Sequence, residues 1–169
     1  MKKLYFTGVV FLFMSFAYNA LMAQDIALLA NNVDPLKLME KFVGKWQASR
    51  GKDTIEVWDF KVYGPHAFIV EIYQTIKGKN TPVSFNPISY DPRTGKFYGF
   101  TLLISGYYGT WIGSFTSETK FNGDMLANFI PEPVYGRLEN IFKNPNEWTW
   151  TGYTPEGKKF LELDFAKVK

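Results

Sequence analysis

The 169-residue sequence contains no cysteine and one histidine, His66. Without cysteine the chain can form no disulfide, carry no lipid on an N-terminal cysteine, and build no Cys-based zinc site. A lone histidine cannot supply the paired imidazoles of the common zinc sites either. We therefore expect neither a bound metal nor a cofactor. His66 follows a tight turn, so we expect a strand-start residue at a barrel rim; a general base or haem ligand is the alternative.

Two catalytic patterns are also missing. No Gly-x-Ser-x-Gly elbow surrounds any serine, and no glycine-rich loop precedes a helix, as a phosphate site requires. The sequence has no block of basic residues, so nucleic acid is not an expected partner.

The first 23 residues have the pattern of a signal peptide. Lys2 and Lys3 precede a largely apolar run over 4–17, and Ala20-Leu21-Met22-Ala23 ends on a small residue. The apolar run is short for a membrane span. We expect cleavage after Ala23, export to the periplasm or the cell exterior without a lipid anchor, and no stable membrane insertion of the mature chain.

Cleavage would change the charge of the working protein. It removes two of the 19 Lys and Arg residues and none of the 16 Asp and Glu residues, which leaves a net charge of about +1. About 146 residues remain, enough for one domain with a substantial core. We predict a flexible leader over 24–32 and a single domain over 33–169.

A short helix is predicted at the start of this domain. Asp34 is a favourable N-cap residue and Pro35 suits the first helical position. Leu36, Met39, Phe42 and Val43 then share one face, and Gly44 can end the helix.

The rest of the sequence predicts an all-β fold. Turn motifs, among them Asp91-Pro92-Arg93-Thr94-Gly95 and Asn122-Gly123, separate segments rich in Val, Ile, Thr and aromatics. These segments predict ten strands, at 45–50, 53–63, 66–77, 82–90, 96–104, 109–121, 124–130, 134–143, 147–154 and 159–168. The connections are too short for parallel crossovers, so each strand should pair antiparallel with the one before it. Closure removes the two exposed edges, which predicts an up-and-down barrel; a curled half-barrel is the alternative.

A short helix, then Phe42-Val43-Gly44-Lys45-Trp46, then an antiparallel meander resembles the calycin superfamily of lipocalins and fatty-acid-binding proteins. The sequence is most similar to the uncharacterised lipocalin-like domains of exported bacterial proteins. The resemblance implies that Gly44 turns the chain from helix into strand, and that Phe42 and Trp46 form the barrel floor, with the helix closing that end.

The sequence also departs from that superfamily. It lacks the helix pair that follows the first strand of fatty-acid-binding proteins, and their Arg-x-Tyr near the C-terminus. The Thr-Asp-Tyr motif of lipocalins is not evident. In place of their late Arg, which stacks on the Trp, the nearest cation is Lys167.

The second and third predicted strands carry polar side chains on both faces, which suits a barrel with a ligand cavity. A two-residue turn at Gly64-Pro65 would place Trp58 opposite Glu71 and Glu56 opposite Tyr73. We predict that Trp58, Glu71 and Tyr73 face the lumen, with Glu56 nearer the rim. The alternative is that this face is the outer wall. A two-carboxylate glycosidase site on Glu56 and Glu71 has no supporting pattern.

Two further residues are candidates for the lumen. Trp111 ends the loop Gly106-Tyr107-Tyr108-Gly109-Thr110, which could gate the barrel mouth or stack on a sugar, or could simply cover the barrel end. Arg137 lies well inside a predicted strand and could anchor an anionic ligand or form a structural ion pair.

The sequence thus predicts a barrel that binds a small apolar or amphipathic molecule in an aromatic-lined cavity, with no catalysis expected. One alternative is an isomerase or hydrolase that uses a lumen carboxylate. Another is an interaction module with a filled core and exposed aromatics such as Tyr107, Tyr108 and Tyr135.

Overall fold

The computed structural model describes residues 33–169. The predicted signal peptide and leader lie outside the described residues. Within 33–169, no helix is both long and apolar enough to span a membrane. Residues Asp34–Lys169 form one compact unit.

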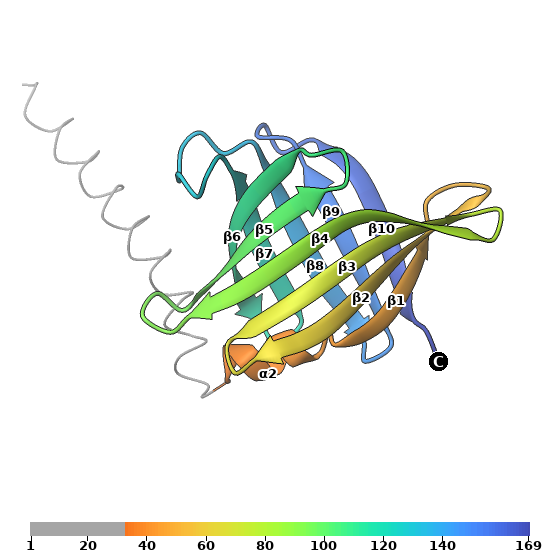
Figure 1. Ribbon diagram of the computed structural model, residues 1–169. Helices are drawn as coiled ribbons and strands as arrows, with labels where there is room; N and C mark the ends of the chain where they lie inside the picture. The colour runs from red at the N-terminus through yellow and green to blue at the C-terminus, as the bar shows by residue number, and fades with distance from the viewer. Residues whose placement is uncertain (1–32) are drawn as a thin grey trace, which may run out of the picture. The chain divides into compact units, whose positions relative to one another are not determined.

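The described chain is a closed barrel of ten antiparallel strands with one short helix, as Figure 1 shows. The predicted fold class is confirmed. The elements are α2 (Pro35–Glu40), β1 (Gly44–Ser49), β2 (Thr54–Gly64), β3 (Ala67–Ile76), β4 (Lys79–Asp91), β5 (Lys96–Leu103), β6 (Tyr108–Ser117), β7 (Lys120–Leu126), β8 (Gly136–Asn144), β9 (Glu147–Tyr153) and β10 (Lys159–Lys167).

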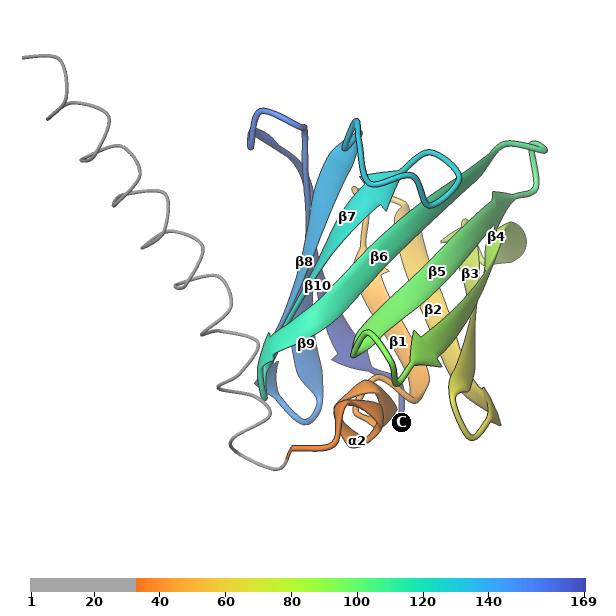
Figure 2. The ribbon, with the colours of Figure 1, turned by 90° about the vertical axis from the view of Figure 1, so that its left-hand side faces the viewer.

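Each strand pairs with its sequence neighbour, and β1 pairs with β10 to close the barrel. Because every connection joins neighbouring antiparallel strands, the turns alternate between the two ends. Figure 2 shows α2 and the C-terminus at one end, and the β5–β6, β7–β8 and β9–β10 connections at the other. We call these the closed end and the open end.

Helix α2 begins as predicted but ends early. The Asp34 side chain accepts a hydrogen bond of 2.9 Å from the Leu36 N–H, and Pro35 occupies the first turn. After Glu40 the N–H groups of residues 41, 42 and 43 bond three residues back, which tightens the last turn. Leu38 and Met39 are buried on the helix, whereas Leu36 is only half-buried.

The segment after α2 packs large aromatic rings into the closed end. Trp46 is fully buried, and its Nε1–H donates a hydrogen bond of 2.5 Å to the Phe42 carbonyl. The Nζ of Lys167 lies 5.0 Å from the centroid of the Trp46 ring. Gly44 has a φ of 119°, and a Cβ there would lie 3.0 Å from Lys167 Cε, so both backbone and space favour glycine.

Helix α2 is also tied to the barrel by a polar contact. Lys41 Nζ donates a 2.7 Å hydrogen bond to the Glu118 carbonyl in the β6–β7 turn. The prediction of a turn at Asn122-Gly123 is therefore wrong, because these two residues lie inside β7. A Cβ on Gly123 would lie 3.1 Å from Leu138 Cδ1, so this glycine serves strand packing.

The predicted pairing of β2 with β3 is also wrong, by one residue. The turn residues are Pro65 and His66, and an irregularity between Val62 and Gly64 shifts the pairing. Trp58 therefore faces Ile72, not Glu71. Since side chains alternate along a strand, this shift of one residue moves every β3 side chain to the face opposite the predicted one.

Trp46→Ala should lower the free energy of unfolding by about 3–5 kcal/mol, because it removes a fully buried indole and leaves a cavity. Urea denaturation followed by circular dichroism measures the loss. Tyr107→Ala, at a side chain that is 75% exposed, is the control and should change stability by no more than about 0.5 kcal/mol. Unchanged stability in Trp46→Ala would show that the ring does not support the closed end.

Candidate functional site: the barrel cavity

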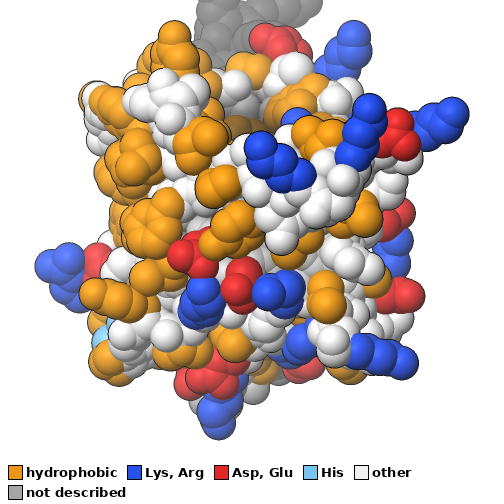
Figure 3. All heavy atoms as spheres, turned by 45° about the vertical axis from the view of Figure 1, so that its right-hand side comes forward, with side chains coloured by type: hydrophobic (Ala, Val, Ile, Leu, Met, Phe, Trp, Pro, Cys, Tyr) orange, Lys and Arg blue, Asp and Glu red, His pale blue; other side chains and the backbone are white. Residues whose placement is uncertain are grey.

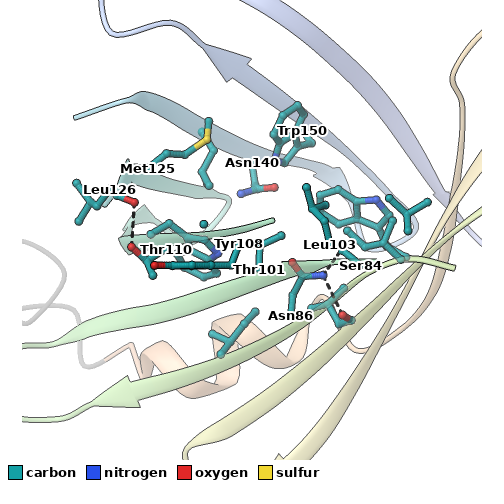
Figure 4. A pocket seen from close by; sticks show the side chains of 18 of the residues that line it. Ser84, Asn86, Thr101, Leu103, Tyr108, Thr110, Met125, Leu126, Asn140 and Trp150 are labelled. Atoms are coloured by element: carbon teal, nitrogen blue, oxygen red, sulfur yellow. Dashed lines mark hydrogen bonds between the residues drawn. The ribbon is translucent and has the colours of Figure 1, made fainter. Parts of the chain in front are cut away.

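The barrel encloses a cavity of about 660 Å³ that extends from α2 towards the open end. Met39 and Phe42 line its floor, and Tyr108 and Tyr135 border its mouth. The volume is typical of small-molecule sites. Figure 4 shows the cavity wall, which combines apolar rings and aliphatic chains with a few polar groups.

Three tryptophans form much of the aromatic wall. Trp58 on β2, Trp111 on β6 and Trp150 on β9 all line the cavity and are half-buried. The Trp58 and Trp150 rings lie 6.2 Å apart between centroids. Trp111 packs across Gly99 of the neighbouring strand β5, where a Cβ would lie 1.9 Å from the indole Cε2. Glycine at position 99 thus makes room for the Trp111 ring.

Glu56 is the only Asp or Glu among the described residues that line the cavity. It is 4% exposed, and both of its carboxylate oxygens are engaged. Arg50 Nη1 lies 2.5 Å from Oε2, and Trp58 Nε1–H donates a 2.8 Å hydrogen bond to Oε1. Arg50 does not line the cavity; its side chain is partly exposed at the β1–β2 connection. Arg50 therefore compensates the buried charge of Glu56, and Glu56 in turn holds the Trp58 ring in place.

Ser84 and Asn86, both buried, add a polar group on β4. Asn86 Nδ2 donates to the Val70 carbonyl at 3.1 Å and to Ser84 Oγ at 2.9 Å. On the facing wall, Asn140 of β8 is also buried and points into the cavity beside Trp150 (Figure 4). No hydrogen bond joins the Asn140 amide to another residue within 33–169.

The mouth is held by polar contacts between β6 and the segment after β7. Tyr108 stacks on Phe100 at 5.5 Å, and its hydroxyl donates a 2.9 Å hydrogen bond to Asn128 Oδ1. Thr110 Oγ1 donates to the Leu126 carbonyl and accepts from the Phe129 N–H, both at 2.9 Å. Tyr108 thus lies at the mouth, where the sequence suggested a gate.

The predicted lumen residues divide into two groups. Trp58 and Trp111 line the cavity, as does Glu56; a ligand-binding role for them stays a prediction. The lumen position predicted for Glu71 and Tyr73 is wrong, because the β2–β3 register shift turns both outward.

On the outer wall Glu71 forms an ion pair with Lys61, which also lies 3.4 Å from Asp59. The hydrogen bond from Lys61 lowers the pKa of Glu71, whereas burial raises the pKa of the Tyr73 phenol. Figure 3 shows acidic and basic side chains next to one another on the outside of the barrel. Since Glu56 and Glu71 lie on opposite faces of the wall, they cannot form a two-carboxylate site.

Arg137 also lies outside, contrary to its predicted place in the lumen. It is exposed on β8 and lies 3.6 Å from Asp124 of β7. Its neighbours Leu138 and Asn140 line the cavity instead. His66 lies in the β2–β3 turn and does not line the cavity.

Sequence reasoning missed Ser84, Asn86 and Asn140. Asn140 alternates with Leu138 and Phe142, so a polar side chain on an otherwise apolar strand face was the available signal. On β4 the sequence pattern is misleading: the apolar Phe85 is exposed, whereas the polar Ser84 and Asn86 are buried. Within 33–169, no group of three or more His, Asp or Glu side chains is arranged to hold a metal ion.

The sequence matches no protein-family model and no curated protein. Among solved structures it is similar to a redesigned beta barrel, mFAP1, bound to DFHBI, at 14% identity and a TM-score of 0.38. That match covers 76% of this chain and 96% of the barrel chain.

Gly99→Ala should displace the Trp111 indole, because the new Cβ would overlap it. We expect a changed tryptophan emission spectrum and a loss of about 1–3 kcal/mol of stability, as in other overpacked cores. Gly109→Ala is the matched control, since a Cβ there meets nothing within 4 Å. Identical emission and stability in Gly99→Ala and wild type would contradict the close contact.

Proposed function

We propose that this protein binds a small, largely apolar molecule inside its barrel and does not transform it. The observation that carries the proposal is the cavity of about 660 Å³ with its three tryptophans. A core with no binding role would gain stability from filling such a space, because empty apolar volume costs folding free energy. An open, aromatic-lined interior with few polar groups is the usual form of a ligand site.

The alternatives from the sequence have less support. Glu56 is the acid available for catalysis in the cavity wall, and both of its oxygens are already held by Arg50 and Trp58. It is therefore placed to orient Trp58, not to accept a proton from a substrate. An interaction module with a filled core does not account for the open interior.

We also propose a lipocalin-like relationship for the barrel. A short helix precedes Gly44-Lys45-Trp46, the Trp is buried at the closed end, and a late cation stacks on it. Lys167 supplies that cation where lipocalins commonly carry Arg. These three features of the closed end support the relationship.

A pair of neighbouring substitutions on β8 tests the binding proposal. Leu138→Trp should fill part of the cavity and weaken uptake of the neutral probe N-phenyl-1-naphthylamine at least about 10-fold, since the space it needs is lost. Arg137→Trp adds the same ring to the outer wall and should leave uptake unchanged. Tryptophan-to-probe energy transfer measures binding, and thermal unfolding confirms that both variants fold. Wild-type protein that takes up no probe would refute the proposal.

Export is a separate proposal, supported by the basic start, the apolar run and the small residues before Gln24. Removal of residues 1–23 would take away none of the described fold. Expressed in a bacterium with an outer membrane, the protein should appear outside the cytoplasm with Gln24 as its first residue, as read by intact mass. Ala23→Arg should block cleavage at this site, whereas Ala27→Arg, beyond it, should not. A cytoplasmic protein retaining residues 1–23 would contradict export.

A further inference from the structure

Asn140 is a buried polar side chain without a protein partner in the described part of the chain. It is 7% exposed, and its amide points into the cavity (Figure 4). Its strand neighbours on the same face, Leu138 and Phe142, are apolar. A buried amide without a protein partner costs folding free energy unless solvent or a ligand pairs with it, so the Asn140 amide is available to a polar group inside the cavity.

The facing wall offers complementary hydrogen-bonding atoms. The Val70 carbonyl can only accept, so the Asn86 atom bonded to it must be the amide nitrogen. Both Nδ2 hydrogens are then used, and Oδ1 remains as a free acceptor within residues 33–169. Ser84 Oγ accepts from Asn86, which leaves its own hydrogen available to donate. Strand β4 is separated from β8 by three strands on one side and five on the other, so these groups lie on opposing walls.

The charge of the wall restricts the ligand. None of the described residues that line the cavity is Lys, Arg or His. A buried anionic ligand would therefore have no cation, and it would meet the Glu56 carboxylate. A cationic ligand would have to replace Arg50, which already lies 2.5 Å from Glu56.

We infer that the cavity selects an uncharged amphipathic ligand whose polar group both donates and accepts hydrogen bonds, such as a primary amide or an alcohol. Asn140 on one wall and the Ser84–Asn86 pair on the other bind this group, and the aromatic wall binds the apolar body. The inference rests on the proposed function, because it specifies the ligand of the same cavity.

A matched decyl series tests this selectivity on the full chain. Decanamide, 1-decanol, decanoate and decylammonium share one apolar chain and differ in the polar group. Each is titrated at pH 7.4, below its micellar concentration, against protein loaded with N-phenyl-1-naphthylamine. Decanamide and decanol should displace the probe with a Kd at least about 10-fold lower than that of either ion, because neither charge finds a free partner.

Variants assign the selectivity to named side chains. Asn140→Leu should weaken decanamide binding roughly 5- to 10-fold, keep probe binding within about 2-fold, and leave the Tm unchanged or higher. Ser84→Ala should weaken decanamide binding by a similar factor, and it replaces Asn140→Leu as the test if that variant does not fold. Asn80→Leu, at an exposed asparagine outside the cavity wall, is the matched control and should bind like wild type.

The outcomes separate this inference from the proposed function. If the wild type binds neither the probe nor any decyl compound, the proposed function fails. If it binds the probe but takes decanoate or decylammonium as tightly as decanamide, the inference alone is overturned. It is likewise overturned if folded Asn140→Leu and Ser84→Ala both bind decanamide like the wild type.

Discussion

Strand β1 meets β10 through two residue pairs, Trp46 with Lys167 and Gln47 with Ala166, and this seam closes the barrel. Trp46 stabilises the seam from inside: it is fully buried, bonds the Phe42 carbonyl, and lies beneath the Lys167 ammonium group. Without the seam, both strands would expose unpaired backbone groups. The enclosed interior, and every side chain directed into it, depends on this closure.

Aromatic rings are distributed unevenly along the interior. At the closed end, Trp46 and Trp148 pack edge to face, and Trp148 stacks on Phe165 at 4.5 Å. Towards the open end, several inward positions beside the three cavity tryptophans carry small or polar residues such as Ser84 and Thr101. Large residues therefore supply stability at one end, while small ones leave space at the other. The cavity follows from this division, since interiors otherwise pack to high density.

The polar groups of the cavity differ in their energetic roles. The Glu56 carboxylate is fully engaged, so it contributes to the shape of the wall without offering a free charge. Asn140 and Asn86 Oδ1 are buried and open to the cavity, which is unfavourable in the free protein unless solvent or a ligand pairs with them. Proteins commonly retain such local costs where function requires them.

The number of elements and their order follow from local patterns in the sequence. Asp34-Pro35 predicts the start of α2, the turn motifs predict ten strands, and short connections require antiparallel neighbours. Gly44 and Trp46 mark the passage from helix to first strand. These features depend mainly on local backbone preferences and on chain length between strands, and both can be read from a single sequence.

Which side chains enter the cavity depends on the strand registers of the folded barrel. The irregularity beside Tyr63 shifts β3 by one residue, so Glu71 and Tyr73 lie outside while Glu56 lies within. On β8 the barrel turns Arg137 outward and Asn140 inward, and at Asn122-Gly123 strand packing overrides a strong turn motif. Successive side chains of a strand point to opposite faces of the barrel wall. One extra residue reverses a whole face, and contacts between strands, which no local pattern records, select the register.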